Sequence, residues 1–240
     1  MFYGSPPIVT NGLIFHLDFL NGQSYYSGSS LVIDMSGNNY SGSFRSSGSS
    51  ANLPTPVQGT LFFSGSGSTG GYVNFSNLTA FNPVPSAISV FTFIYIVTGS
   101  TSQMAVCKDD ASTPSLRDFQ LQINASNQVA LTVWNSAAGL VTVAGGTTVP
   151  VGTWNYVGGT WNGTTVTTYL NGLQQSTGAL ASPPLHSSAV PVQIGAVSGS
   201  AGISSPFNGY IALAQIYNRA LSQAEIRQNY QAQKSRFNLT

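Results

Sequence analysis

The sequence predicts an all-β protein, a two-sheet antiparallel jelly-roll sandwich with a short C-terminal helix. Three observations point to this fold class: many short apolar segments, turn residues between them, and one clear helix-start signal near the C-terminus. A chain of 240 residues is long enough to bury one sandwich core. No repeat of fixed period is visible, which argues against a solenoid or a propeller. We expect one jelly-roll domain over residues 13–233, preceded by an extended arm over 1–12 and followed by a tail over 234–240.

Apolar segments with the period-2 pattern of strands recur along the chain. Residues 22–71 are rich in Ser, Gly and Asn, and their apolar islands are expected to be short strands joined by long turns. Asn162-Gly163 and Asn171-Gly172 are predicted to form type I′ hairpin turns, because both turn residues need positive φ. The predicted strands are 13–19, 31–33, a short one at 44, 61–63, 87–97, 104–108, 118–123, 128–134, 154–161, 165–170, 192–194 and 209–217.

The last predicted strand is apolar on both faces and leads into a helix that begins at Ser222. The Ser222 side chain can accept a hydrogen bond from the backbone N–H of Glu225, while the Glu225 carboxylate reaches back to the Ser222 N–H. Leu221 can pack on Ile226 as a hydrophobic staple. Ile226 and Tyr230 lie one turn apart, which predicts a short amphipathic helix packed against the sheet edge.

Three parts of the chain resemble one group of families. Residues 207–230 carry the pattern F-x-G-x-I-x-x-x-x-I-Y-x-R-A-L-S-x-x-E-I-x-x-x-Y. This pattern resembles the last strand and closing helix of concanavalin A-like jelly rolls, in particular the laminin-G-like and pentraxin-like domains. Residues 152–157 with 166–172, and residues 12–18 with 33–38, resemble the same families. The resemblance spans most of the chain and implies the fold, but these families include lectins, adhesion modules, enzymes and virion proteins.

The composition excludes several classes of function. Only 5% of the residues are charged, against a usual share of about a quarter, so the surface is built from Ser, Thr, Asn, Gln and Gly. A net charge of +1 offers no basic stripe for a phosphate backbone, and we expect no nucleic-acid binding. The longest apolar stretch is about half of what spans a bilayer as a helix, so no membrane insertion is expected. The N-terminus shows no secretory signal, and Met1 favours synthesis in a cytoplasm.

Catalytic groups are scarce in this sequence. Its acids are five Asp and Glu225, and hydrolysis of glycosides by the usual route needs two facing carboxylates. His16 and His186 are not accompanied by a G-x-S-x-G nucleophile motif, and two histidines with one cysteine match no zinc spacing. Cys107 has no neighbouring His and is expected to be a small buried hydrophobe. We expect a non-catalytic protein that requires no cofactor.

A calcium site is one candidate, because the laminin-G-like and pentraxin-like domains that the chain resembles often bind Ca²⁺ at one rim of the sandwich. The local cluster of Asp109, Asp110 and Asp118 could offer the oxygen ligands that hard cations take. The alternative is a solvated turn in which Lys108 and Arg117 are the ion partners of these carboxylates.

A sugar site would use an exposed aromatic ring stacked on a pyranose face, with Asn, Asp or Gln side chains binding the hydroxyl groups. Four aromatic residues near predicted loops are the candidate ligand-binding residues. They are Tyr25, Tyr26, Tyr72 and Trp134.

Low charge, few catalytic groups and the missing signal together favour a structural or adhesion component of a particle, and a tailed bacteriophage fits best. The segments G-L-I-F-H-L-D, D-M-S-G-N and Y-N-R-A-L-S are similar to laminin-G-like domains of bacteriophage decoration, head-fibre and tail proteins. The resemblance implies a place on the virion surface, made in the host cytoplasm, where the domain docks on capsid or tail proteins through a sheet face or the N-terminal arm. We expect self-association there and contact with host glycans. The alternative is a carbohydrate-binding module or lectin of a cellular secreted protein.

Overall fold

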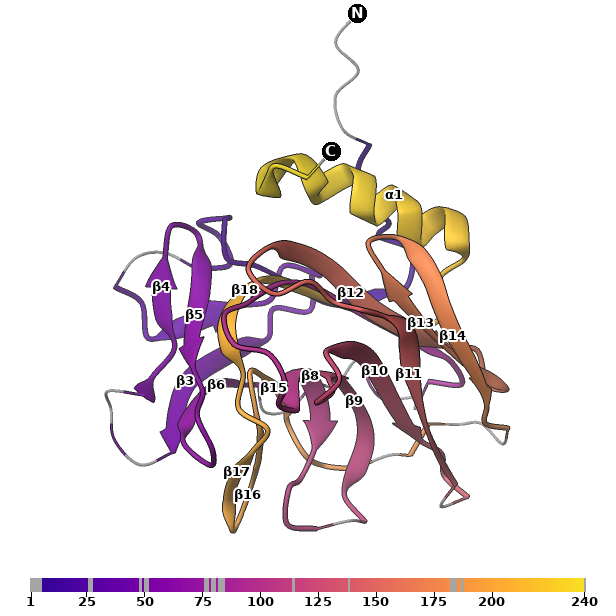
Figure 1. Cartoon of the computed structure of the whole chain (residues 1–240), viewed down its shortest axis with the longest axis horizontal. Coiled ribbons are helices and arrows are strands. Elements are labelled where there is room, and N and C mark those ends of the chain that lie inside the picture. Colours follow the sequence, from indigo (N-terminus) through magenta and orange to yellow (C-terminus); the bar gives the residue numbers. More distant parts are fainter. Residues whose placement is uncertain are drawn as a thin grey trace, which may run out of the picture.

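Two antiparallel β-sheets pack face to face, and one helix lies on the outer face of the first sheet (Figure 1). The computed structural model describes residues 6–25, 28–47, 49, 52–75, 78, 81, 85–113, 115–137, 139–181, 185–186 and 188–239. The described strand pairs are antiparallel. The predicted two-sheet jelly-roll sandwich with a C-terminal helix is confirmed. None of the described helices has the length and apolar character needed to cross a bilayer.

The first sheet is centred on two long strands, β7 and β18, which pair with each other over most of their length. Its strands, in spatial order, are β14 (Leu173–Ala179), β13 (Thr165–Leu170), β12 (Trp154–Trp161), β7 (Ile88–Ile96), β18 (Asn208–Tyr217), β5 (Thr60–Ser64) and β4 (Thr55–Val57), with β1 (Leu13–Asp18) also paired to β18. The last strand of the chain, β18, therefore lies in the middle of this sheet, between β7 and β5.

The second sheet closes the other side of the sandwich. Its strands, in spatial order, are β11 (Leu140–Thr148), β10 (Gln128–Trp134), β9 (Arg117–Ile123), β8 (Gln103–Asp109), β15 (Val192–Ile194), β6 (Gly70–Phe75), β3 (Ser41–Ser47) and β2 (Leu31–Ile33). A separate hairpin joins β16 (Val197–Gly199) to β17 (Gly202–Ser204). The sequence did not predict β4, β6, β11, β14, β16 or β17. Among these, β11 and β14 are mostly polar and largely exposed, so they show no clear apolar alternation.

The main core fills the space between the two sheets. Phe15 of β1 and Phe75 of β6 meet there edge to face, with ring centroids 4.9 Å apart. Trp161 is fully buried, and its indole Nε1 donates a hydrogen bond to the carbonyl oxygen of Leu180 at 2.8 Å. Burial of such large apolar side chains is the main favourable contribution to folding.

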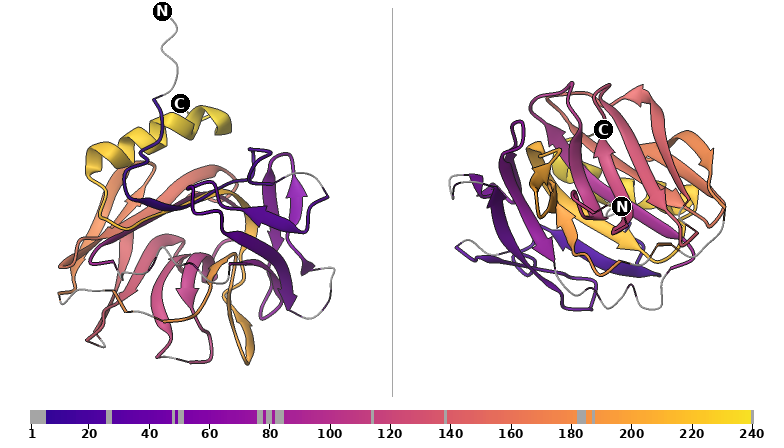
Figure 2. Two further views of the ribbon diagram at one scale, coloured as in Figure 1. Left: turned by 180° about the vertical axis from the view of Figure 1, so that it is seen from behind. Right: turned by 90° about the horizontal axis from the view of Figure 1, so that it is seen from below.

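A second core lies on the outer face of the first sheet, beneath α1 (Gln223–Gln233) (Figure 2). Phe93 of β7 stacks on Phe237, which follows the helix, with ring centroids 4.4 Å apart. The ring of Phe93 also contacts that of Tyr156 in β12, with centroids 4.8 Å apart. Ile226 of the helix belongs to the same hydrophobic cluster. The helix covers central strands and also reaches the predicted sheet edge, where Gln223 Nε2 donates to the Gly172 carbonyl at 2.6 Å beside the edge strand β14. The central strands are covered because the apolar outer face of β7, β12 and β18 needs a cover.

The start of α1 forms as predicted. The Ser222 hydroxyl accepts a hydrogen bond from the Glu225 N–H at 3.3 Å, and the Ser222 N–H donates to the Glu225 carboxylate at 2.8 Å. Leu221 and Ile226 lie in the same hydrophobic cluster. Arg219 adds two hydrogen bonds to the Glu225 carboxylate, at 2.6 and 2.9 Å, and this contact lowers the pKa of Glu225 to about 2. The start of the helix is thus stabilised by the Arg219–Glu225 ion pair as well as by the capping box.

The described part of the N-terminal arm contacts the chain's own helix. The Val9 N–H donates to Asn229 Oδ1 at 2.7 Å, and the Tyr217 hydroxyl donates to the Val9 carbonyl at 3.0 Å. Gln228 Nε2 donates to the Pro7 carbonyl at 2.8 Å. These bonds make residues 7–9 a strap that ties α1 to the sheet. Residues 1–5 lie outside the described residues.

Residues 234–237, assigned to a C-terminal tail from the sequence, form the 3₁₀ helix η3 (Lys234–Phe237). Phe237 is buried and packs against Phe93 and against Trp154, with ring centroids 4.7 Å apart in the second pair. The end of the chain therefore completes the second core.

Of the two predicted hairpin turns, one has the predicted backbone. Asn171 and Gly172 have φ values of 50° and 78°, as a type I′ turn requires. In the other turn Gly163 has a positive φ of 91° but Asn162 does not, which corrects the type I′ assignment. The Asn162 side chain instead accepts hydrogen bonds from the N–H groups of Thr164 and Thr165 at 3.0 and 2.8 Å, a side-chain-stabilised turn.

Removal of the helix cap should weaken the fold measurably. Ser222→Ala deletes the acceptor for the Glu225 N–H, and we expect the free energy of unfolding to fall by about 1 kcal/mol. Ser222→Thr keeps an acceptor at this position and serves as the matched control, with a smaller loss expected. Urea unfolding of the three proteins gives the values. Equal stability of the Ala variant and the wild type would show that the cap contributes nothing.

Candidate functional site

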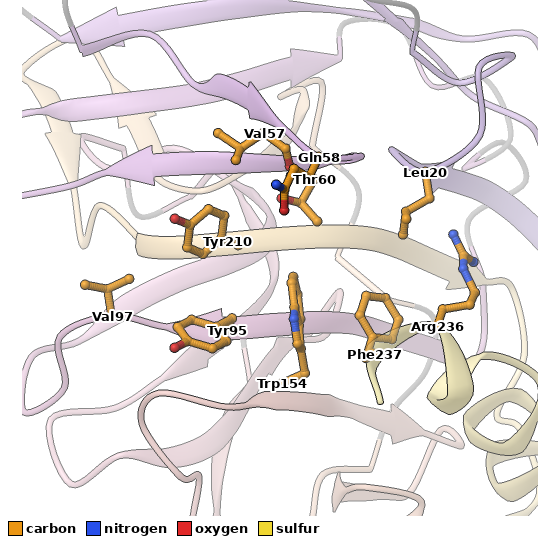
Figure 3. A pocket seen from close by; sticks show the side chains of 10 residues that line it. All are labelled: Leu20, Val57, Gln58, Thr60, Tyr95, Val97, Trp154, Tyr210, Arg236 and Phe237. Carbon is orange, nitrogen blue, oxygen red and sulfur yellow. The ribbon is translucent and has the colours of Figure 1, made fainter. Parts of the chain in front are cut away.

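The outer face of the first sheet is open beyond Phe237, and it forms a pocket there that we call the outer pocket. Its volume is about 510 Å³, within the range of small-molecule sites. The pocket is lined by Leu20, Val57, Gln58, Thr60, Tyr95, Val97, Trp154, Tyr210, Arg236 and Phe237 (Figure 3). The site therefore lies where the cover provided by α1 and η3 ends.

Three aromatic side chains, Tyr95, Trp154 and Tyr210, form the centre of the outer pocket, and we call them the aromatic cluster. They come from the neighbouring strands β7, β12 and β18, and the sheet register places Tyr95 directly opposite both of the others. The ring centroids of Tyr95 lie 5.8 Å from Trp154 and 5.7 Å from Tyr210. All three side chains are partly exposed. Figure 3 shows the Trp154 ring standing between Tyr95 and Phe237.

The strand alternation explains why these rings face outward. Ile94 and Ile96 flank Tyr95 in β7, and both are buried in the main core. Because successive side chains of a strand point to opposite faces, Tyr95 points away from the main core. Tyr210 precedes Ile211, another residue of the main core, and points outward for the same reason.

Gln58 reaches the pocket from a tight hairpin turn. Gln58 and Gly59, between β4 and β5, have φ values of 46° and 78°, the combination found in type I′ turns. The next residue, Thr60, donates its hydroxyl proton to the Val57 carbonyl at 2.7 Å. Polar groups thus border the aromatic cluster on the side of β5.

Several polar groups of the pocket are available to a ligand. Within the described part of the chain, no hydrogen bond engages the hydroxyls of Tyr95 and Tyr210, the indole N–H of Trp154 or the amide of Gln58. The phenol groups can donate and accept, the indole donates, and the carboxamide does both. The pocket therefore combines apolar ring surface with unused hydrogen-bonding capacity.

At the charged end of the pocket, Arg236 forms an ion pair with Asp18 of the same chain. Arg236 Nη2 donates to Asp18 Oδ1 at 2.5 Å, and Arg236 Nη1 donates to Asp18 Oδ2 at 2.9 Å. The Asp18 carboxylate also accepts a hydrogen bond from the Leu20 N–H at 3.1 Å. None of the ten lining residues carries a carboxylate. The lining therefore lacks the two facing carboxylates that hydrolysis of glycosides by the usual route requires.

The aromatic residues predicted from the sequence do not line the outer pocket. Tyr25 is half-buried, with its ring centroid 5.8 Å from Phe44, and packs on the main core. Tyr72 lies within β6, opposite Arg45 of β3, rather than in a loop. Tyr26 lies outside the described residues. Tyr25 and Tyr72 therefore lie apart from the outer pocket, and their predicted ligand binding stays a prediction.

Trp134 lines a smaller cavity of about 360 Å³, which we call the Trp134 pocket. The guanidinium carbon of Arg117 lies 5.9 Å from the Trp134 ring centroid, so a cation occupies one face of the ring. The other lining residues are Ser115, Asn135, Ser136, Leu140 and His186. One face of the Trp134 ring is thus covered by Arg117 of the same chain.

The three carboxylates predicted to bind calcium are engaged in contacts of the chain itself. Asp118 pairs with Lys108 Nζ at 2.5 Å and lies 3.0 Å from His186 Nδ1. Asp109 accepts a hydrogen bond from Gln120. These partners hold the two carboxylates in place, although both are buried rather than solvated.

Asp110 stabilises the turn that follows β8. Its Oδ1 atom accepts hydrogen bonds from the N–H groups of Ser112 and Thr113, each at 2.8 Å. Arg117 Nε lies 3.4 Å from Asp109, so Lys108 and Arg117 are the ion partners that the alternative interpretation named. The described residues contain no group of three His, Cys, Asp or Glu side chains placed to hold a metal ion. The residues present do not fit the predicted calcium ion.

The remaining chemically active side chains have structural positions. Cys107 is fully buried, and burial raises the pKa of its thiol well above the usual value, so the predicted buried hydrophobe is confirmed. His16 is buried, and burial lowers its pKa. Neither residue lines the outer pocket.

The two packed sheets form a jelly roll, and the comparison with protein families agrees. Residues 66–227 match the family model of the concanavalin A-like lectin/glucanases superfamily, in its laminin-G form. The chain belongs to this superfamily, and the resemblance to concanavalin A-like and laminin-G-like jelly rolls is confirmed. No curated protein matches the sequence.

Solved structures with this fold include parts of botulinum neurotoxins. The binding domain of botulinum neurotoxin DC in complex with SialylT superposes with a TM-score of 0.65 at 14% identity, covering 92% of this chain and 51% of that one. A structure of botulinum neurotoxin type C, described with its interaction with two ganglioside molecules, superposes with a TM-score of 0.64 at 15% identity. The match covers 92% of this chain and 51% of that one. The binding domain of botulinum neurotoxin DC in complex with rat synaptotagmin II superposes with a TM-score of 0.65 at 16% identity. The match covers 92% of this chain and 52% of that one. The chain spans about half the length of these proteins, and at such identity the similarity shows the fold alone.

The buried Asp109 should make stability depend on pH. Burial raises its pKa to about 6 from an ordinary value of 3.8, against the opposing effects of Gln120 and Arg117. The folded protein therefore holds this proton more tightly than the unfolded chain. The resulting stabilisation is fully present below pH 3.8 and is lost as the pH rises through about 6.

Asp109→Asn removes this titration because the amide stays neutral. We expect the stability of the variant relative to the wild type to increase between pH 4 and pH 7, measured by urea unfolding at each pH. A relative stability that falls over the same range would contradict the raised pKa.

Proposed function

We propose that this protein is a non-catalytic, lectin-like domain that binds glycans in the outer pocket. The observation that carries the proposal is the aromatic cluster of Tyr95, Trp154 and Tyr210, bordered by polar groups without partners among the described residues. A sugar ring has apolar C–H faces and hydroxyl groups at its edge. Tyr and Trp side chains match both, because each joins an apolar ring to a polar group.

The exposure of apolar side chains around the cluster supports a binding role. Leu20 and Val97 line the pocket and are 42% and 44% exposed. They lie at opposite ends of the pocket, with the aromatic cluster between them (Figure 3). Polar groups that fix the orientation of a ligand are expected beside it, and Gln58 and Thr60 hold that position.

Binding rather than hydrolysis is favoured by the residue types in the pocket. The superfamily includes lectins and glucanases by name, and a glucanase site needs acidic groups that the lining of the outer pocket does not offer. Two of the structurally similar proteins are described with SialylT and with gangliosides. These ligands support glycans as a class to test, although those chains are about twice as long.

Substitution of Trp154 tests the proposal. Trp154→Ala removes the central ring, and we expect the affinity for a glycan found on an array to fall at least about tenfold, equivalent to about 1.4 kcal/mol. Tyr210→Phe removes one hydroxyl and keeps the ring, so a smaller loss of about 0.5–1.5 kcal/mol is expected. Isothermal titration calorimetry measures both values.

Trp134→Ala is the matched control, because it removes the same side chain from the Trp134 pocket. Circular dichroism and thermal unfolding of each variant show whether the fold is intact. A glycan that binds equally to wild type and Trp154→Ala, or loses binding in Trp134→Ala instead, contradicts the assignment of the outer pocket.

For the biological setting, we propose the surface of a virion, as a capsid decoration, head-fibre or tail protein. The support is the similarity of residues 12–18, 34–38 and 217–222 to laminin-G-like domains of bacteriophage proteins, together with the low charge of the chain. In this setting the outer pocket contacts host glycans while other surfaces bind capsid or tail proteins and further copies. A secreted cellular lectin or carbohydrate-binding module is the alternative setting.

Sedimentation of particles separates the two settings. We expect the protein to co-sediment with assembled capsids or tails from the source of the sequence, in a fixed ratio to the major structural protein. Recovery of the protein solely from the soluble, particle-free fraction would favour the secreted lectin.

A further inference from the structure

We infer that the outer pocket selects neutral glycans over acidic ones, and that Asp18 sets this selection by pairing with Arg236. The inference rests on the proposed function and names the class of ligand. Arg236 is the one charged residue among the ten that line the pocket. Whether its charge is available to a ligand therefore decides the preference of the whole site.

The charge of Arg236 is compensated within the chain. Its two terminal nitrogens donate to the two oxygens of Asp18 at 2.5 and 2.9 Å, the bidentate geometry in which guanidinium and carboxylate bind most strongly. Nη1 also approaches Gln233 Oε1 at 3.4 Å. The groups that would recognise a carboxylate of a ligand are thus occupied by a carboxylate of the protein.

Asp18 is held firmly in this role. The residue is 8% exposed, and its Oδ1 atom also accepts the Leu20 N–H at 3.1 Å. Its backbone N–H donates to the Ser24 hydroxyl at 3.2 Å, and β1 pairs it with Leu213 of β18. The carboxylate cannot turn away from Arg236 without also losing the Leu20 N–H hydrogen bond, and the backbone that carries it is held in β1.

An acidic sugar would meet unfavourable electrostatics at this pocket. Its carboxylate would lose water on entry and gain no unpaired cation, and next to Arg236 it would also face the negative charge of Asp18. A neutral sugar has no such cost. The hydroxyls of Tyr95 and Tyr210 and the amide of Gln58 can bind hydroxyl or acetamido groups, and Figure 3 shows both phenol groups directed away from Arg236.

Matched pairs of glycans test the preference. We would titrate the wild type with lactose and 3′-sialyllactose, and with galactotriose and trigalacturonate, because the acidic member of each pair adds or carries carboxylates on a related sugar. We expect the neutral member of the bound pair to have an affinity at least about tenfold higher. Binding at the outer pocket is assigned by its loss in Trp154→Ala and its retention in Trp134→Ala.

Substitution of Asp18 should reverse the preference. Asp18→Asn keeps the shape and an acceptor for the Leu20 N–H but removes the negative charge, so Arg236 becomes available. We expect the ratio of acidic to neutral affinity to rise at least about tenfold, and the rise to shrink at high salt because it is electrostatic. In the double variant Asp18→Asn/Arg236→Gln the rise should disappear. Arg236→Gln alone should leave the ratio in favour of the neutral glycan, which tests the inference even if Asp18→Asn folds poorly.

Different outcomes separate this inference from the proposed function. An acidic glycan that binds the wild type as tightly as its neutral partner, with binding lost in Trp154→Ala, overturns the neutral preference and leaves the glycan site in place. An Asp18→Asn variant that folds but keeps the wild-type ratio overturns the role of Asp18. Failure of every neutral and acidic glycan to bind overturns the proposed function and the inference with it.

Discussion

The structure depends on one sheet that is apolar on both faces. In the central strands β7 and β18, Ile94 and Ile211 face the main core, while Phe93 and Leu213 face the second core. A sheet of this kind cannot leave its outer face in water without losing much of the free energy gained by burial. The capping box of α1, the strap at Val9 and the aromatic contacts of η3 all serve to hold the C-terminal cover on that face.

The candidate site lies where this cover ends. Phe237 of the cover contacts Trp154, the first ring of the open part, with centroids 4.7 Å apart. Beyond it the same apolar face continues as the partly exposed aromatic cluster, rimmed by Gln58 from a hairpin turn and by the Asp18–Arg236 pair. The position of the pocket therefore follows from how far α1 and η3 cover the sheet, and the charge of its arginine is balanced by the carboxylate of Asp18 at the end of β1.

The parts of the fold that depend on local signals could be predicted from the sequence. The helix start could be predicted because Ser222 and Glu225 lie within one turn, and the long strands could be predicted from apolar alternation. Strands β11 and β14 could not, since their polar residues face solvent at the edges of the sheets. Tyr95, Trp154 and Tyr210 fell inside predicted strands, but alternation does not reveal which of two apolar faces stays open. That depends on where a helix distant in sequence begins and ends. Tyr25 lies near a predicted loop, and the packing of its ring against Phe44 of a distant strand is a contact that local patterns do not reveal.

The three tryptophans allow a direct test of the central claim that glycans bind at the outer face of the first sheet. Trp154 lies in the outer pocket, Trp134 in the smaller pocket on the second sheet, and Trp161 in the main core with its indole bonded to Leu180. Each indole N–H gives its own signal in a ¹H–¹⁵N NMR spectrum. During titration with a neutral glycan the account predicts that the Trp154 signal shifts with saturation while those of Trp134 and Trp161 stay in place. A saturating shift at Trp134 with an unchanged Trp154 would contradict it.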